Sequence, residues 1–237
     1  MPFKFKQFTI HQDKCAMKIG TDGVLLGAWT SIKNYPDSIL DIGTGTGIIA
    51  LQLAQRSDAS TIDALEIDDN AYEQAVANFE NSKWGDRLFC YHASLEEFTD
   101  EIDEKYELII ANPPFYNDQF ETTNIARNKA RFTSSLSFES LIISTSKLLT
   151  GNGTFSTIIP FKEEQNFIKI AEKNELFPVR ICRVKGNPSS EIKRSLLEFS
   201  FENDKPITTN LIIEINRHEY TDDYIDLVKD FYLKMES

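Results

Sequence analysis

Residues 38–47 read SILDIGTGTG, an apolar run that ends in an acidic residue and continues into three glycines at alternate positions. The apolar run predicts a buried strand, and the helical spacing of apolar residues in 46–56 predicts a helix directly after it. Glycine has no Cβ, so the turn between strand and helix can be tight and a ligand can approach its backbone. This stretch therefore predicts the first strand–turn–helix unit of an α/β fold, with a ligand at the turn.

Short apolar runs and amphipathic stretches alternate on both sides of this unit. Strands are predicted at residues 61–66, 88–91, 106–111 and 154–159, and helices at about 21–33, 69–80, 95–98, 137–149 and 162–174. Residues 179–184 and 195–201 flank the turn-rich Lys185-Gly186-Asn187-Pro188 and predict an antiparallel hairpin, followed by a helix from Thr221 to about Met235. Residues 116–135 are expected to form a long polar loop. This order predicts a Rossmann-like, seven-stranded, mostly parallel sheet with an antiparallel C-terminal hairpin and helices on both faces.

Composition excludes several classes of protein. The 237 residues are 41% hydrophobic, enough for one ordinary core. The three cysteines, Cys15, Cys90 and Cys182, are scattered and lack metal-site spacing, so we expect reduced thiols and no bound metal. The N-terminus does not resemble a signal peptide, and no run of about 18 apolar residues is present. We therefore expect a soluble, cytoplasmic protein.

The net charge of −12 is unevenly distributed. Residues 41–119 carry a net charge of −13, whereas residues 1–40 and 120–200 carry +2 and +4. An anionic surface repels nucleic acid, so the distribution matters more than the total. On charge alone, an uneven solvated surface is the favoured explanation of this pattern.

The glycine turn and the next strand end predict the kind of ligand. The spacing of Gly43, Gly45 and Gly47 is G-x-G-x-G, whereas dinucleotide-binding turns have G-x-G-x-x-G. Asp41 before the turn would repel a phosphate but suits an ammonium group, directly or through water. Glu66 ends the second strand and is expected to accept hydrogen bonds from ribose hydroxyls. These features favour a ligand with an amino-acid end and a nucleoside end.

Two polar positions near these strand ends have alternative interpretations. Ser94 follows the third strand and offers a hydroxyl to an adenine ring, or it caps the helix that begins at Leu95. Asp68 and Asp69 follow Glu66 and are expected to cap the next helix.

The fourth predicted strand runs into Asn112-Pro113-Pro114-Phe115, the most specific motif in the chain. Two prolines end the strand and fix a rigid turn. The Asn112 side-chain oxygen and the Pro113 carbonyl can then accept both hydrogen bonds of a planar NH2 group, and Phe115 can stack on its ring or amide plane. We expect catalysis here by positioning and electrostatics, with Asn112 also touching the cofactor.

These motifs resemble those of methyltransferases that act on exocyclic amines of nucleobases or on glutamine amides, which implies a class I methyltransferase sheet and S-adenosylmethionine as cofactor. Residues 5–29, which include CAMKIGTDGVLLGAW at 15–29, and YIDLVKDFYL at 224–233 resemble the bacterial valine-tRNA adenine-N6 methyltransferases. That family modifies the adenosine 3′ of the anticodon. The resemblance covers nearly the whole chain and implies that four residues of the N-terminal segment pack over the cofactor: Thr21, Asp22, Gly23 and Leu25. Ala93-Ser94 depart from the broader fold, in which an acidic residue is commoner.

An RNA substrate requires cationic and aromatic side chains near the catalytic turn. The candidates form three clusters: Lys4 and Lys6 among Phe3, Phe5 and Phe8; Arg127, Lys129 and Arg131 with Phe132; and Lys185, Lys193 and Arg194. We expect one domain over residues 1–237, with 1–37 covering the cofactor and facing RNA and 38–237 forming the catalytic core. The sequence does not determine the oligomeric state, and a monomer is our expectation.

Three functions compete. The leading one is transfer of a methyl group to adenine N6 in tRNA. Methylation of another exocyclic amine in rRNA, or of a protein glutamine, uses the same motif, but a glutamine methyltransferase would normally carry a helical N-terminal domain, and only about 37 residues precede the first strand of the predicted sheet. A cofactor-binding assembly module without activity is disfavoured by the intact Asn112–Phe115 motif.

Overall fold

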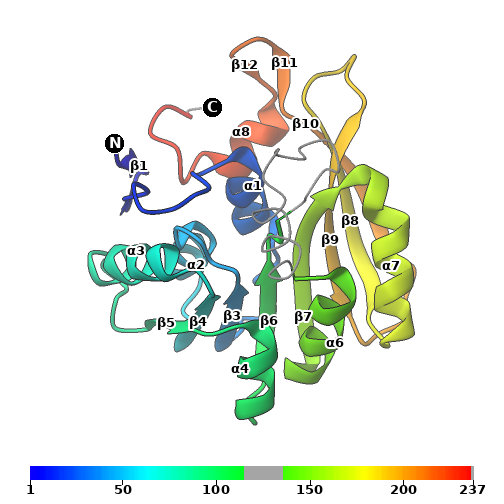
Figure 1. The fold of residues 1–237 in the computed structure, drawn as a ribbon. Coiled ribbons are helices and arrows are strands. Elements are labelled where there is room, and N and C mark those ends of the chain that lie inside the picture. The colour runs from blue at the N-terminus through cyan, green and yellow to red at the C-terminus, as the bar shows by residue number, and fades with distance from the viewer. Residues whose placement is uncertain (115–135, 236–237) are drawn as a thin grey trace, which may run out of the picture.

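An eight-stranded sheet forms the centre of the computed structural model, which describes residues 1–114 and 136–235 (Figure 1). Its strand order is β10-β8-β9-β7-β6-β3-β4-β5. The strands are β3 (Ser38–Ile42), β4 (Thr61–Glu66), β5 (Leu88–His92), β6 (Tyr106–Ala111), β7 (Leu149–Pro160), β8 (Phe177–Lys185), β9 (Ile192–Ser200) and β10 (Ile207–Ile212). Only β9 runs antiparallel to its neighbours in this sheet. The carboxyl ends of β3, β4, β6 and β7 therefore share one edge with the start of β9.

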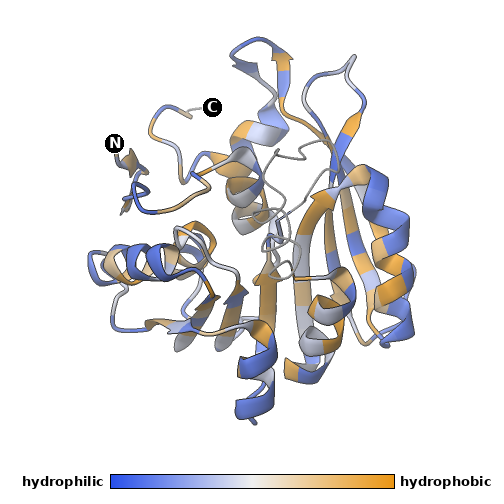
Figure 2. Ribbon diagram, in the orientation of Figure 1, coloured by the Kyte–Doolittle hydropathy of each residue, from blue (hydrophilic) through white to orange (hydrophobic). Residues whose placement is uncertain are grey.

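Helices cover both faces of the sheet. One apolar cluster joins the sheet to α1 (Thr21–Trp29), α2 (Ile48–Arg56), α3 (Asp69–Glu80) and α8 (Asp222–Val228). The other joins it to α4 (Leu95–Glu101), α6 (Phe138–Leu148) and α7 (Glu164–Lys173), and a short turn of 3-10 helix, η1 (Phe161–Glu163), precedes α7. Adjacent side chains of β3 point to opposite faces of the sheet, because Ile39 belongs to the first cluster and Leu40 to the second. Hydrophilic residues lie on the outer sides of α3 and α7 (Figure 2).

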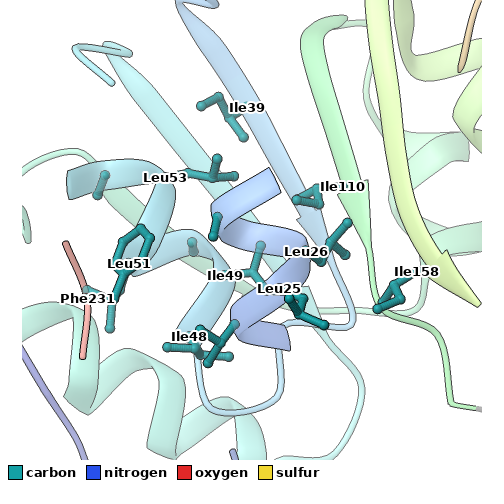
Figure 3. Packing of buried hydrophobic residues seen from close by; sticks show 14 of the residues in the cluster. Leu25, Leu26, Ile39, Ile48, Ile49, Leu51, Leu53, Ile110, Ile158 and Phe231 are labelled. Atoms are coloured by element: carbon teal, nitrogen blue, oxygen red, sulfur yellow. The ribbon is translucent and has the colours of Figure 1, made fainter. Parts of the chain in front are cut away.

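Helix α1 packs deep in the first cluster. Leu25 and Leu26 are only 1% and 0% exposed, and Figure 3 shows them close to Ile48 and Ile49 of α2 and to Ile110 of β6. Burying one leucine side chain contributes about 1.5–3 kcal/mol. The start of α1 is thereby held at the sheet edge where the parallel strands end.

The two ends of the chain are joined to each other. Strands β1 (Phe3–Lys4) and β2 (Thr9–Ile10) form a short antiparallel pair. The amide of Lys6 donates to the Phe231 carbonyl at 2.8 Å, and Phe5 forms an antiparallel bridge with Tyr232. The segment that follows α8 therefore holds the N-terminal hairpin in place.

The predicted fold class is confirmed, with differences at its margins. The sheet gains an eighth strand, β10, which pairs in parallel with β8. Its first four residues are exposed, and its sequence ITTNLI lacks the alternation of apolar and polar residues that indicates a half-buried strand. Strand β7 begins at Leu149, within what was predicted as the end of a helix, and α8 ends at Val228, before the predicted Met235. The two short pairs β1–β2 and β11 (Glu214–Asn216) with β12 (Glu219–Tyr220) were not predicted.

Candidate active site

The glycine turn connects β3 to α2 at the edge where the parallel strands end. Gly43, Gly45 and Gly47 have φ angles of 69°, 57° and 81°, a region that other residues rarely adopt. A Cβ at Gly47 would lie 2.5 Å from the Phe79 ring, so this glycine lets α3 pack against the turn. A Cβ at Gly43 or Gly45 would meet nothing within 4 Å, which leaves the upper side of the turn open to a ligand.

Asp41 lies beneath this turn. Its side chain is fully buried, and the Thr44 hydroxyl donates to its Oδ2 at 2.6 Å, whereas its Oδ1 has no partner among the described residues. Burial raises the pKa of Asp41 to about 7, and the hydrogen bond from Thr44 offsets only part of this. Asp41 does not line the cavity, and its predicted contact with an ammonium group, directly or through water, stays a prediction. Asp41 supports the turn from below, and a cation bound above it would favour the ionised form.

We expect Asp41→Asn to remove a pH dependence of stability. The folded-state pKa lies above the ordinary carboxyl value, so the contribution of Asp41 is present at low pH and is lost as pH rises through about 7. At 1.36 kcal/mol per pKa unit, the wild type should lose about 2–3 kcal/mol of unfolding free energy between pH 5 and pH 8. Denaturant unfolding without cofactor would measure this loss. An equal loss in Asp41→Asn would contradict the prediction, and exposed Asp58→Asn is the control.

Glu66 ends β4 beside the turn. Its Oε2 accepts a hydrogen bond from the Gly45 amide at 2.8 Å, and its Oε1 accepts from the amides of Ile67 and Asp68 at 2.9 Å. The carboxylate therefore fixes the turn from the neighbouring strand. Its predicted contact with ribose hydroxyls stays a prediction.

Two of the three residues proposed as helix caps act as caps, whereas Asp69 is the first residue of α3 and does not cap it. Asp68 caps α3 by accepting from the amides of Asn70 and Ala71. Ser94 caps α4: its hydroxyl accepts from the Glu97 amide at 3.2 Å, and its own amide donates to Glu97 Oε2 at 3.0 Å, which completes a reciprocal capping box. The capping interpretation is therefore confirmed, and the predicted contact of Ser94 with the adenine ring stays a prediction.

A cavity of about 940 Å³ opens at this edge of the sheet. It is lined by the glycine turn, by the start of α1 and by the residues that follow β6, which include predicted site residues Thr21, Asp22, Gly23, Gly43, Gly45, Asn112, Pro113 and Pro114. A Cβ at Gly23 would lie 3.9 Å from Asn112 Nδ2, so α1 passes close to this side chain. Phe115 lies outside the described residues. Leu25, Asp41, Gly47 and Glu66 are buried and do not line the cavity.

The far side of the cavity was predicted only in part, through the proposed RNA-binding residues Lys193 and Arg194. It is formed by Pro160, Phe161 and Lys162 at the end of β7, and by Glu191–Arg194 at the start of β9, while residues 17–20 line the near side. The available signal was the position of Phe161 just past the predicted fifth strand, after Pro160. Arg194 Nε donates to Asp22 Oδ2 at 2.8 Å, so a residue predicted to bind RNA is paired with one predicted to touch the cofactor.

The predicted RNA-binding residues are only partly gathered at the cavity. Lys193 and Arg194 line it, Lys4 and Lys6 are exposed on the N-terminal segment, and Lys185 ends β8. Phe5 and Phe8 are 4% and 7% exposed and stack on each other, so their predicted role beside RNA is wrong. The remaining cluster lies outside the described residues: Arg127, Lys129, Arg131 and Phe132.

Several proteins of known class resemble this chain. A methyltransferase small domain model matches residues 23–135. The tRNA1(Val) (adenine(37)-N6)-methyltransferase of Christiangramia forsetii is 59% identical over 99% of this chain and 98% of its own length. The enzymes of the same name from Flavobacterium johnsoniae and Bacteroides fragilis are 58% and 45% identical over 98% of this chain, covering 100% and 98% of their own lengths.

The chain belongs to this methyltransferase family. Solved structures show the same fold at low identity. A predicted O-methyltransferase from Agrobacterium tumefaciens is 18% identical, with a TM-score of 0.69 over 89% of this chain and 96% of its own. A Pyrococcus furiosus methyltransferase is also 18% identical, with a TM-score of 0.55 over 79% of this chain and 89% of its own. The resemblance seen in the sequence is therefore confirmed.

The cavity of this family member fits S-adenosylmethionine, the cofactor of class I methyltransferases. The glycine turn leaves open space for a ligand, and the unpartnered buried Oδ1 of Asp41 favours a positive charge nearby. All three cysteines are free thiols, as predicted. No helix in residues 1–114 or 136–235 is both long and apolar enough to cross a membrane.

Proposed function

We propose that this protein transfers a methyl group from S-adenosylmethionine to the N6 amine of an adenosine in tRNA, at position 37 of tRNA1(Val). The observation that carries this function is the shared cavity, in which Asn112 and Pro113 face the same space as the glycine turn. Curated relatives with this name match almost the full chain. We also propose that residues 1–237 act as one cytoplasmic domain.

The cofactor supplies an electrophilic methyl group. The open glycine turn holds it, Glu66 fixes the turn, and Asp41 contributes negative charge from below. Thr21, Asp22 and Gly23 at the start of α1 close the cavity on the other side. The Asp22–Arg194 pair connects this cover to β9.

The target amine is held on the β6 side of the cavity. The Asn112 side-chain oxygen and the Pro113 carbonyl accept its two hydrogen bonds, and this directs the nitrogen lone pair toward the methyl group. Pro113 and Pro114 keep the two acceptors rigid, so the acceptors need little rearrangement when the transition state forms. Phe115 is proposed to stack on the target.

Cationic side chains around the cavity provide a path for the RNA backbone. Lys18, Lys162 and Lys193 line the cavity, although the chain as a whole is acidic. Phosphate contacts contribute most of the salt-dependent affinity of a protein for nucleic acid. We therefore propose that the backbone of tRNA crosses the β7–β9 side of the cavity.

Replacing Lys162 and Lys193 together by glutamine should weaken tRNA binding and reduce its salt dependence. Each lost phosphate contact lowers the slope of log Kd against log salt by about 0.7–0.9. Filter binding at several salt concentrations would measure the slope. Lys173 and Lys205 are exposed near the start of β8 and the end of β9, at the opposite edge of the sheet, and replacing both is the matched control. Equal slopes in the two double variants would place the RNA backbone elsewhere.

Transfer of labelled methyl groups to separate tRNA, rRNA and protein fractions tests the function. We expect label in tRNA, and nuclease digestion should recover it as N6-methyladenosine. Label confined to rRNA or to protein glutamine would show that this fraction, and not tRNA, contains the substrate. Absence of transfer to any fraction would support a non-catalytic role.

A further inference from the structure

The strand order separates the two ends of the cavity. Across the sheet the order is β4, β3, β6, β7 and then β9. The glycine turn and Glu66 follow β3 and β4, whereas Asn112 follows β6 in the middle. A planar group whose amine is held by Asn112 must therefore extend either back toward the cofactor or onward over the ends of β7 and β9. The onward space is the part of the cavity lined by Phe161 and by the start of β9.

Phe161 packs in that space against an ion pair whose carboxylate is buried. Its ring lies below the Arg183 guanidinium, with 5.5 Å between the guanidinium carbon and the ring centre. Arg183 donates to Glu164 Oε1 at 2.8 Å, and the Ser195 hydroxyl donates to Glu164 Oε2 at 2.6 Å. The Glu164 side chain is only 1% exposed. Burial raises the pKa of Glu164, but the hydrogen bonds from Arg183 and Ser195 outweigh it and hold this pKa below its usual value.

The antiparallel pair β8–β9, which carries Arg183 and Ser195, has a matched set of residues on its other face. Arg180 pairs with Glu198 at 3.1 Å, and its guanidinium carbon lies 4.2 Å from the centre of the Trp29 ring. Arg180 and Arg183 side chains are both 32% exposed, and both glutamates are almost fully buried. The two sets differ in one respect that matters here. Phe161 lines the cavity, and Trp29 does not.

We propose that the Phe161 ring forms a wall of the pocket for the target adenine, and that Arg183 and Glu164 hold it in place. This assignment rests on the proposed function. An aromatic ring held at a fixed angle can stack on a base that has left its own strand. Pro160 before it fixes the backbone at the end of β7, so the ring position is rigid from both sides. Stacking accepts any base, so Phe161 places the ring while Asn112 and Pro113 select its amine.

Phe161→Leu tests this assignment, because leucine keeps apolar bulk but has no ring face. We expect kcat/KM for tRNA to fall about tenfold, the lower part of the range for one base–aromatic stack. Phe161→Tyr and Phe161→Trp should restore most of it. The affinity for S-adenosylhomocysteine, measured by calorimetry, should not change, because the ring lies on the side of Asn112 away from the glycine turn.

Trp29→Leu is the control for a loss of stability alone. It removes the equivalent ring from the matched set and should leave kcat/KM within about twofold of wild type while lowering the melting temperature. Wild-type kcat/KM in Phe161→Leu, or failure of Tyr and Trp to restore activity, would overturn the assignment. A loss of S-adenosylhomocysteine binding in Phe161→Leu would do so as well. Absence of tRNA methylation by the wild type would instead overturn the proposed function, and this assignment with it.

Discussion

Asn112→Ala is expected to lower the single-turnover rate of methyl transfer by about 100- to 1000-fold at saturating cofactor and tRNA. This is the range for losing one preorganised hydrogen-bonding group that acts mainly in the transition state. Asn112 directly follows the buried strand β6 and lines the cavity beside Pro113, so its position is set by the sheet. Cofactor affinity should fall much less, because the glycine turn and Glu66 lie on the neighbouring strands.

Asn112→Asp refines this prediction. A carboxylate still accepts from an NH2 group, so partial activity should survive if acceptance is the only role of this side chain. Activity as low as that of Asn112→Ala would mean that the Asn112 NH2 group also donates a required bond. Asn210→Ala, at an exposed position of β10, is a matched control and should retain full activity. Near-wild-type transfer by Asn112→Ala would refute the mechanism.

Gly45→Val should abolish cofactor binding. Gly45 has a φ of 57°, and a side chain there would project into the open space above the turn. A non-glycine residue in such a conformation costs about 1–3 kcal/mol, and the branched side chain also takes the volume that the ligand needs. Calorimetry should show S-adenosylhomocysteine binding to the wild type and none to the variant. Neither protein should bind NAD with an affinity comparable to that of the wild type for S-adenosylhomocysteine.

Gly151→Val is the control, because it tests whether valine at a glycine position lowers cofactor binding in general. This variant should bind the cofactor like the wild type. Gly151 lies in β7 with nothing within 4 Å of its added Cβ, outside the left-handed region and away from the cavity. Gly45→Ala should also lose affinity, and the strain at this position should lower its melting temperature by about 2–12 °C without unfolding it at 25 °C. Unchanged cofactor binding by folded Gly45→Val would show that the turn is not the cofactor site.

The sequence predicted those elements whose apolar residues are buried on the sheet or on one face of a helix. Strands β3, β4 and β6 are buried and largely apolar, and a polar residue of the proposed site lies at or next to the end of each: Asp41, Glu66 and Asn112. Strand β10 escaped prediction because its position at the sheet edge leaves Ile207–Asn210 exposed. Short pairs such as β1–β2 depend on contacts between distant segments, which periodicity does not record.

The site itself was predicted at strand ends but not in its tertiary details. Nothing local indicates that Asp41 is fully buried, or that Asp22 pairs with Arg194 across 172 positions of chain. Phe161 was missed because a single aromatic residue after a strand has no motif of its own. Its significance depends on the neighbour relation of β7 to β6, which follows from sheet order.

The junction between the chain ends has a consequence for synthesis on the ribosome. Phe5 and Phe231 belong to the same buried cluster, and the Lys6 amide needs the Phe231 carbonyl as its partner. The N-terminal hairpin is synthesised long before Phe231, which forms part of its docking surface. The nascent chain must therefore carry this aromatic segment undocked until Phe231 has left the ribosome.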